Sequence, residues 1–139
     1  MNYKLIFNIA LFGFVIGILN ILGFSGDFEW LFWLIFLIGG SLLITKKGNE
    51  KLFLSASICG FLFAAFVYAT EAIGVQQYIE SNPDMRERLT SLPDGLQPGR
   101  YLISLGLIVS IINGFIMGCL ALGFNKFFRK SNYLSKNLS

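Results

Sequence analysis

Four long stretches of this chain carry almost no charged side chains. They run over about residues 5–24, 28–45, 52–75 and 101–124. A helix rises about 1.5 Å per residue, so about 20 residues cover about 30 Å, the thickness of the hydrocarbon core of a bilayer. The sequence therefore predicts an all-α fold, a four-helix transmembrane bundle that forms one membrane domain over residues 1–139.

The composition argues against a soluble domain and against a nucleic-acid partner. Hydrophobic residues make up 55% of the chain and charged residues only 14%, whereas roughly a quarter of the residues of a soluble domain are charged. The net charge is +3, but the basic residues stand in short clusters between the apolar stretches rather than on one polar face. We therefore expect the lipid bilayer as the surroundings of this chain, and no nucleic acid.

Residue types that usually carry catalysis or bind metals are scarce. The chain has no His, and its two cysteines, Cys59 and Cys119, each stand alone in an apolar stretch. This pattern provides no Ser/His or Cys/His pair and no metal-binding spacing. We expect no catalytic residue, no metal and no cofactor. The two thiols are interpreted as small core residues that could be neighbours on the cytoplasmic half of the bundle.

The distribution of Lys and Arg predicts the orientation, because short cytoplasmic loops of membrane proteins are enriched in these residues. If the N-terminus is inside, eight basic residues fall on the cytoplasmic side and three on the outer side. The inner set is Lys4, Lys46, Lys47, Lys51, Lys126, Arg129, Lys130 and Lys136, and the outer set is Arg86, Arg88 and Arg100. The excess predicts that both termini are cytoplasmic.

Small residues recur at intervals of four in three of the spans. They are Gly106, Ser110, Gly114 and Gly118 in the fourth span, Ala56, Gly60 and Ala64 in the third, and Gly13 and Gly17 in the first. In lipid, helices associate through close backbone approach and interhelical polar contacts. We expect the third and fourth spans to meet along these residues, either within one chain or across a homo-oligomer.

Three asparagines lie inside the apolar stretches, at Asn8, Asn20 and Asn113. An amide without a hydrogen-bond partner is costly in hydrocarbon. We therefore expect each of them to face the bundle and to bond to a neighbouring helix, and we favour this structural role over coordination of a substrate.

Glu71 is the acidic residue that lies within the apolar length of a span, about one turn before the outer end of the third. A carboxyl group in a membrane is a functional hypothesis by default, because the bilayer penalises it unless it is paired or hydrated. We favour a structural ion pair with Arg100 at the start of the fourth span. The alternative is a proton-coupled transport role.

The polar segment between the third and fourth spans, residues 76–100, predicts a short helix over about 83–91. Asn82 suits its N-cap and Pro83 its first position. Met85, Leu89 and Leu92 give this helix one apolar face, which could lie on the bilayer surface or over the outer mouth of the bundle. The carboxylates Glu80, Asp84 and Glu87 alternate with arginines, which is typical of a solvated helix face.

Three stretches of the chain resemble small uncharacterised four-span membrane proteins of bacteria. They are Tyr78-Ile-Glu-Ser-Asn-Pro-Asp-Met85, Pro98-Gly-Arg-Tyr-Leu102, and the Gly-rich final span that ends in Lys126-Phe-Phe-Arg-Lys130. The resemblance covers the whole chain and implies a location in the bacterial inner (plasma) membrane. It implies no activity and no catalytic residue.

These observations favour a non-enzymatic integral membrane protein that acts as an accessory or interaction subunit, with a homo-oligomer or another membrane protein as its partner. The alternative is a small oligomeric transporter or channel that uses Glu71.

Overall fold

The structure, a computed structural model, describes residues 1–24, 28–47, 51–93 and 95–136, with side chains up to Phe128. Within these ranges every regular element is a helix. Four helical segments are long and apolar enough to cross a membrane, namely Tyr3–Ile21, Glu29–Lys46, Leu52–Ile73 and Pro98–Phe128. The prediction of an all-helical chain with four apolar spans is thus confirmed.

The first span consists of two helices in sequence, α1 (Tyr3–Ala10) and α2 (Phe12–Ile21). Leu11 joins them in a helical conformation, and its N–H still donates to the Phe7 carbonyl. The span ends at Ile21 rather than near residue 24, because Gly23 has a positive φ of 73°. The N–H of the next residue, Phe24, donates back to the Leu19 carbonyl, which closes the helix end as a Schellman motif.

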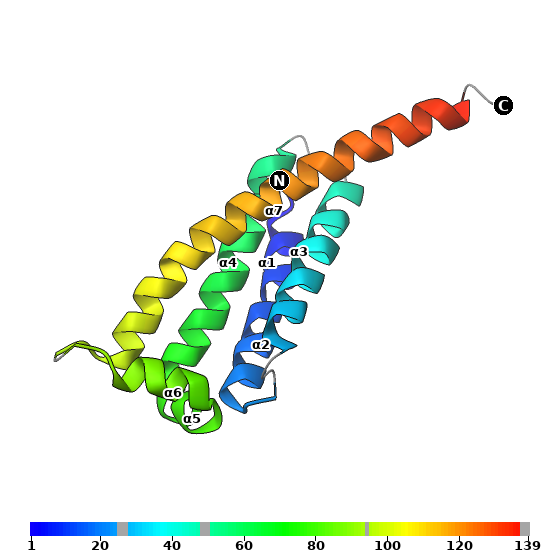
Figure 1. The fold of residues 1–139 in the computed structure, drawn as a ribbon. Coiled ribbons are helices and arrows are strands. Elements are labelled where there is room, and N and C mark those ends of the chain that lie inside the picture. Colours follow the sequence, from blue (N-terminus) through cyan, green and yellow to red (C-terminus); the bar gives the residue numbers. More distant parts are fainter. Residues whose placement is uncertain (25–27, 48–50, 94, 137–139) are drawn as a thin grey trace.

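The other spans are single helices, α3 (Glu29–Lys46), α4 (Leu52–Ile73) and α7 (Pro98–Lys136). At 39 residues α7 is about 58 Å long, and it continues well past the other spans (Figure 1). The connection between the first two spans includes residues 25–27, and the segment before the fourth span includes residue 94. These positions lie outside the described residues.

Two short helices, α5 (Val75–Ser81) and α6 (Pro83–Thr90), cover one end of the bundle, opposite the N-terminus (Figure 1). We call this end the capped end. Leu89 of α6 is buried in a small core with Tyr78 and Leu102, and the side chains of Met85 and Leu92 pack against that core. The apolar face of α6 therefore lies over the mouth of the bundle, one of the two positions that the sequence allowed.

The main core surrounds α4, which packs against α1, α2, α3 and α7. At its centre the Phe36 ring stacks on the Phe63 ring with centroids 3.5 Å apart. The first span contacts α3 only sparsely. Between them remains an apolar crevice of about 370 Å³, which we call the open crevice. Its lining includes Asn8, Phe12, Ile35, Gly39 and Leu43.

Candidate functional site

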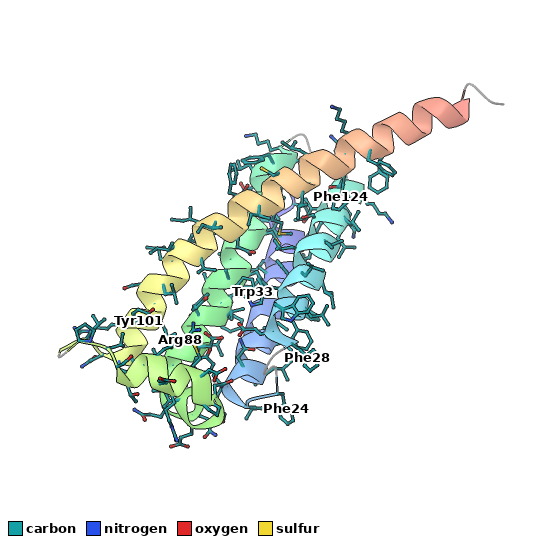
Figure 2. All side chains as sticks on the ribbon, in the orientation of Figure 1. Phe24, Phe28, Trp33, Arg88, Tyr101 and Phe124 are labelled. Carbon is teal, nitrogen blue, oxygen red and sulfur yellow. The ribbon has the colours of Figure 1, made fainter. Side chains whose placement is uncertain are left out.

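Four polar side chains from three different spans meet beneath the capped end. Asn20 is the second-last residue of α2, Glu29 and Trp33 lie in the first two turns of α3, and Glu71 lies two residues before the end of α4. We call this group the polar cluster. Consecutive spans are antiparallel. The same end of the bundle therefore holds the last turns of α2 and α4 and the first turns of α3. Figure 2 shows Trp33 among the helices.

A single amide group joins the two carboxyl groups of the polar cluster. Asn20 Nδ2 donates to Glu71 Oε1 at 2.6 Å and to Glu29 Oε1 at 3.0 Å. Trp33 Nε1 also donates to Glu29 Oε1, at 3.1 Å. Asn20 and Glu71 are almost fully buried, with 1% and 2% of their surface exposed. The amide therefore bridges two acidic groups in a part of the bundle from which water is largely excluded.

The segment between α5 and α6 closes over the polar cluster. Asn82 Nδ2 donates to the backbone carbonyls of Asn20, at 2.9 Å, and of Tyr78, at 3.0 Å. Asn82 occupies the N-cap position of α6 as predicted, but its side chain makes no capping hydrogen bond there. It instead ties the capped end to α2, which holds α5 and α6 over the two carboxyl groups.

A pocket of about 400 Å³ lies beside the polar cluster at the capped end. Its lining includes Glu29, Tyr78, Asn82, Asp84 and Arg88. Glu29 is only partly buried, so it contacts both this cap pocket and the buried Asn20. Burial raises the pKa of the Tyr78 phenol, and the charges of Glu71 and Glu29 raise it further. Tyr78 therefore lines the pocket as a neutral group.

The predicted ion pair between Glu71 and Arg100 is not formed. The Arg100 side chain is exposed, and the buried partner of Glu71 is the Asn20 amide. Among the described residues, no Lys or Arg forms an ion pair with Glu71 or Glu29. The sequence interpretation is therefore corrected, because Arg100 extends into solvent while Glu71 points into the bundle. The two carboxyl groups have hydrogen bonds but no neighbouring positive charge in contact.

The small residues predicted to pack helices lie at close helix contacts. A Cβ added to Gly114 would be 2.6 Å from the Ser57 carbonyl of α4, and one added to Gly60 would be 2.9 Å from the Asn113 carbonyl of α7. Added Cβ atoms at Gly106 and Gly118 would meet Tyr68 and Ser57, and Ser110 is fully buried. These residues bring α4 and α7 together within one chain.

The remaining small residues of that prediction lie on the other side of α4 or in its core. Gly13 and Gly17 place α2 against the Phe63 and Val67 carbonyls of α4. Ala56 and Ala64 are fully buried. The first span therefore also approaches α4 through its glycines.

The three asparagines have different surroundings. Asn113 Nδ2 donates to the Gly60 carbonyl at 2.7 Å, and Asn20 bonds within the polar cluster, so the prediction of inward-facing amides is confirmed for these two. It is wrong for Asn8. Asn8 is exposed in the open crevice, and its amide forms no hydrogen bond among the described residues. The helix turns this residue toward the gap between the first span and α3.

The two cysteines also differ. Cys59 is fully buried, and its thiol donates to the Ile6 carbonyl at 3.6 Å, as expected for a small core residue. Cys119 is exposed, so the core interpretation fails for it. Glu80, Asp84 and Glu87 are exposed on the short helices, and in the described part of the chain no three Asp, Glu, Cys or His side chains gather as metal ligands.

Glu29 is a residue of the polar cluster that the sequence analysis did not single out. It lies nine residues after Asn20, on the other side of the hairpin and at the same end of the bundle. A tryptophan four residues later, at Trp33, was a further signal, because residues at i and i+4 share a helix face. No comparable pattern in the sequence predicts the bond from Asn82 to the Asn20 carbonyl, because the two residues are far apart in the chain.

The chain was compared with protein families, with curated proteins and with solved structures, and none of them matches it. The polar cluster and the open crevice therefore have to be interpreted from their own geometry.

Proposed function

We propose that this protein is a non-enzymatic, multi-pass membrane protein that binds a proton at the polar cluster and acts as a small proton-coupled transporter or channel. The observation that carries this proposal is the single Asn20 amide between two carboxyl groups, at 2.6 and 3.0 Å. The sequence favoured an accessory role, and for Glu71 it favoured an ion pair with Arg100 over proton-coupled transport. Without that ion pair, the transport alternative gains weight.

The charge of the polar cluster supports proton binding. Two ionised carboxylates this close together repel each other, and removing them from water adds a large cost that only paired charge or hydrogen bonds offset. Arg88 is exposed and lines the cap pocket, where its charge acts on the Tyr78 phenol. Within the described chain it forms no ion pair with either carboxyl group. One proton taken up from water by Glu71, the buried carboxyl group, removes the repulsion and leaves the amide bridge intact.

Access to the polar cluster is from the capped end, through the cap pocket to Glu29. We place this end outside the cell, because eight basic residues lie at the other end or beyond it and three lie near the capped end. The short helix α6 then lies at the outer interface, and the membrane is the plasma (inner) membrane of a bacterium. Reporter fusions after residues 26, 48, 90 and 139 should read outside, inside, outside and inside, and an outside C-terminus would reverse this assignment.

The test of proton coupling uses purified protein in vesicles that contain a fluorescent pH indicator. An imposed pH gradient should collapse faster than in empty vesicles. Glu71→Gln should reduce the added rate at least tenfold, because the amide keeps an oxygen for Asn20 but cannot exchange a proton in this range. Glu80→Gln, which removes an exposed carboxyl group of α5, is the matched control and should leave the rate unchanged.

Two results would contradict the proposal. The first is a wild-type protein that shows no proton flux above that of empty vesicles. The second is a Glu71→Gln variant that keeps the full wild-type rate. Thermal unfolding in detergent checks that the variant is folded.

A second function, that of an accessory or interaction subunit, is favoured by one observation, the exposed Asn8 amide in the open crevice. Purification in mild detergent tests it. A different membrane protein that remains bound at constant ratio through several steps would support this function, and a chain that purifies alone would count against it.

A further inference from the structure

The open crevice is a gap between two helices of the bundle. The first span and α3 form its two walls, and between them it encloses about 370 Å³ of apolar space. A Cβ added at Gly39 of α3 would find nothing within 4 Å, whereas the adjacent Gly40 faces inward against Met117. The crevice therefore has a bare stretch of helix backbone on one wall, where another helix can approach closely.

Asn8 is the polar side chain that lines this apolar crevice. It lies five residues after the start of α1 and Gly39 lies seven residues before the end of α3, so both are about 8 to 10 Å inside the span. At this depth an amide has little access to water, and leaving its hydrogen bonds unmade is costly. The position of Asn8 therefore calls for a polar partner from outside the bundle.

The chemistry of the crevice narrows the choice of partner. No charged side chain is part of its lining, so a partner with a charged group would bury that charge unpaired. An amide is both donor and acceptor and is therefore complementary to another amide. Two copies related by an axis normal to the membrane present the same residue to each other at the same depth.

We propose that the open crevice is a homodimer interface, in which the Asn8 amides of two copies hydrogen-bond to each other while Gly39 allows the helices to approach. The proposal does not depend on proton binding, because it involves neither Glu29 nor Glu71. It goes beyond the proposed function by naming the second copy of this chain as the partner and the residues that recognise it.

The test measures dimerisation in vesicles by energy transfer between labelled copies over a range of protein-to-lipid ratios. The wild-type chain should dimerise. Asn8→Leu should weaken dimerisation about tenfold, since interhelical hydrogen bonds in membranes contribute modestly, and Asn8→Gln, which restores an amide, should recover most of it. Gly39→Leu should weaken it as well, and Ile108→Leu on the exposed face of α7 should not.

Three outcomes would overturn the inference. The first is a wild-type chain that stays monomeric at every density, and the second is a dimer that Asn8→Leu does not affect. The third is a monomer that binds a different membrane protein through Asn8. Because Asn8 and Gly39 have no partners within the described chain, these variants should unfold at the wild-type temperature at protein densities where both are monomeric, so a lost dimer cannot be a lost fold. Proton flux is measured in a separate experiment, so failure of the proposed function can be told apart from failure of the dimer proposal.

Discussion

The contact between α4 and α7 and the open crevice are built from the same kinds of residue, yet only the first is closed within the chain. Each combines an asparagine with nearby glycines. At the first, Asn113 bonds to the Gly60 carbonyl and Gly114 lies against the Ser57 carbonyl. At the second, Asn8 has no hydrogen-bond partner among the described residues, and a Cβ added at Gly39 would meet nothing within 4 Å. An asparagine beside small residues thus marks a place for helix contact without saying which helix provides it.

A shallow apolar groove of about 380 Å³ runs beside the contact of α4 with α7, and Gly114 is part of its lining. The difference between the two regions is therefore not the presence of a groove. It is that the amide of Asn113 is satisfied inside the bundle and that of Asn8 is not.

The largest expected effect is that of Gly114→Leu. The new side chain would collide with the Ser57 carbonyl, which is backbone and cannot rotate away, so we expect the free energy of unfolding to fall by about 3 kcal/mol. Gly39→Leu in the open crevice should change it by less than about 0.5 kcal/mol. Unfolding in detergent at low protein density measures both. Equal losses would remove the distinction between the two regions.

Replacement of either asparagine by leucine should have a smaller effect on the free energy of unfolding. Asn113→Leu leaves the buried Gly60 carbonyl without its side-chain donor, and we expect a loss of about 1 kcal/mol in the free energy of unfolding. Asn8→Leu removes no hydrogen bond within the chain and should cost nothing in the monomer. If Asn8→Leu is as destabilising as Asn113→Leu, Asn8 has a partner within the fold.

The smallest effect concerns the contact of α3 with α7, which is made through hydroxyl groups. Thr45 Oγ1 donates to the Ala121 carbonyl at 3.2 Å as well as to the Ser41 carbonyl of its own helix. Thr45→Val keeps the volume and should cost about 0.6 kcal/mol. Thr70→Val is the control, because Thr70 bonds to the Phe66 carbonyl of its own helix, and it should cost less. The reverse order would show that the bond between α3 and α7 contributes nothing.

Much of the fold follows from the sequence because the bilayer requires long apolar helices, and their length and lack of charge are visible directly. The helix ends are less visible. The first span stops at Ile21 since Gly23 adopts a left-handed conformation, which a hydropathy pattern does not report. The small residues of the third and fourth spans could be found because close approach needs a fixed spacing.

The candidate site was predicted only in part, because it is formed by residues that are distant in the sequence. Glu71 stood out as an acid in an apolar stretch, but its partner depends on how α2 and α3 are rotated about their axes. Arg100 lies near the same end of the bundle as Glu71 and has the opposite charge, but its side chain is exposed. The Asn20 side chain instead points toward Glu71 and donates to it. Asn8 and Asn20 occupy the same span, and rotation alone exposes the first and buries the second.

The path of α7 across the bundle has a mechanical consequence. Along its length it follows α4 from Gly106 to Gly118, and the carbonyls of Met117 and Ala121 also accept hydrogen bonds from α3. Its course across the bundle is oblique (Figure 1). Such a diagonal contact resists sliding of α3 past α4. Among the described residues, the first span is tied to α3 by a side-chain hydrogen bond at the capped end, from Asn20 to Glu29. The compliant direction is therefore a hinge-like opening of the first span away from α3 at the opposite end, where the open crevice lies.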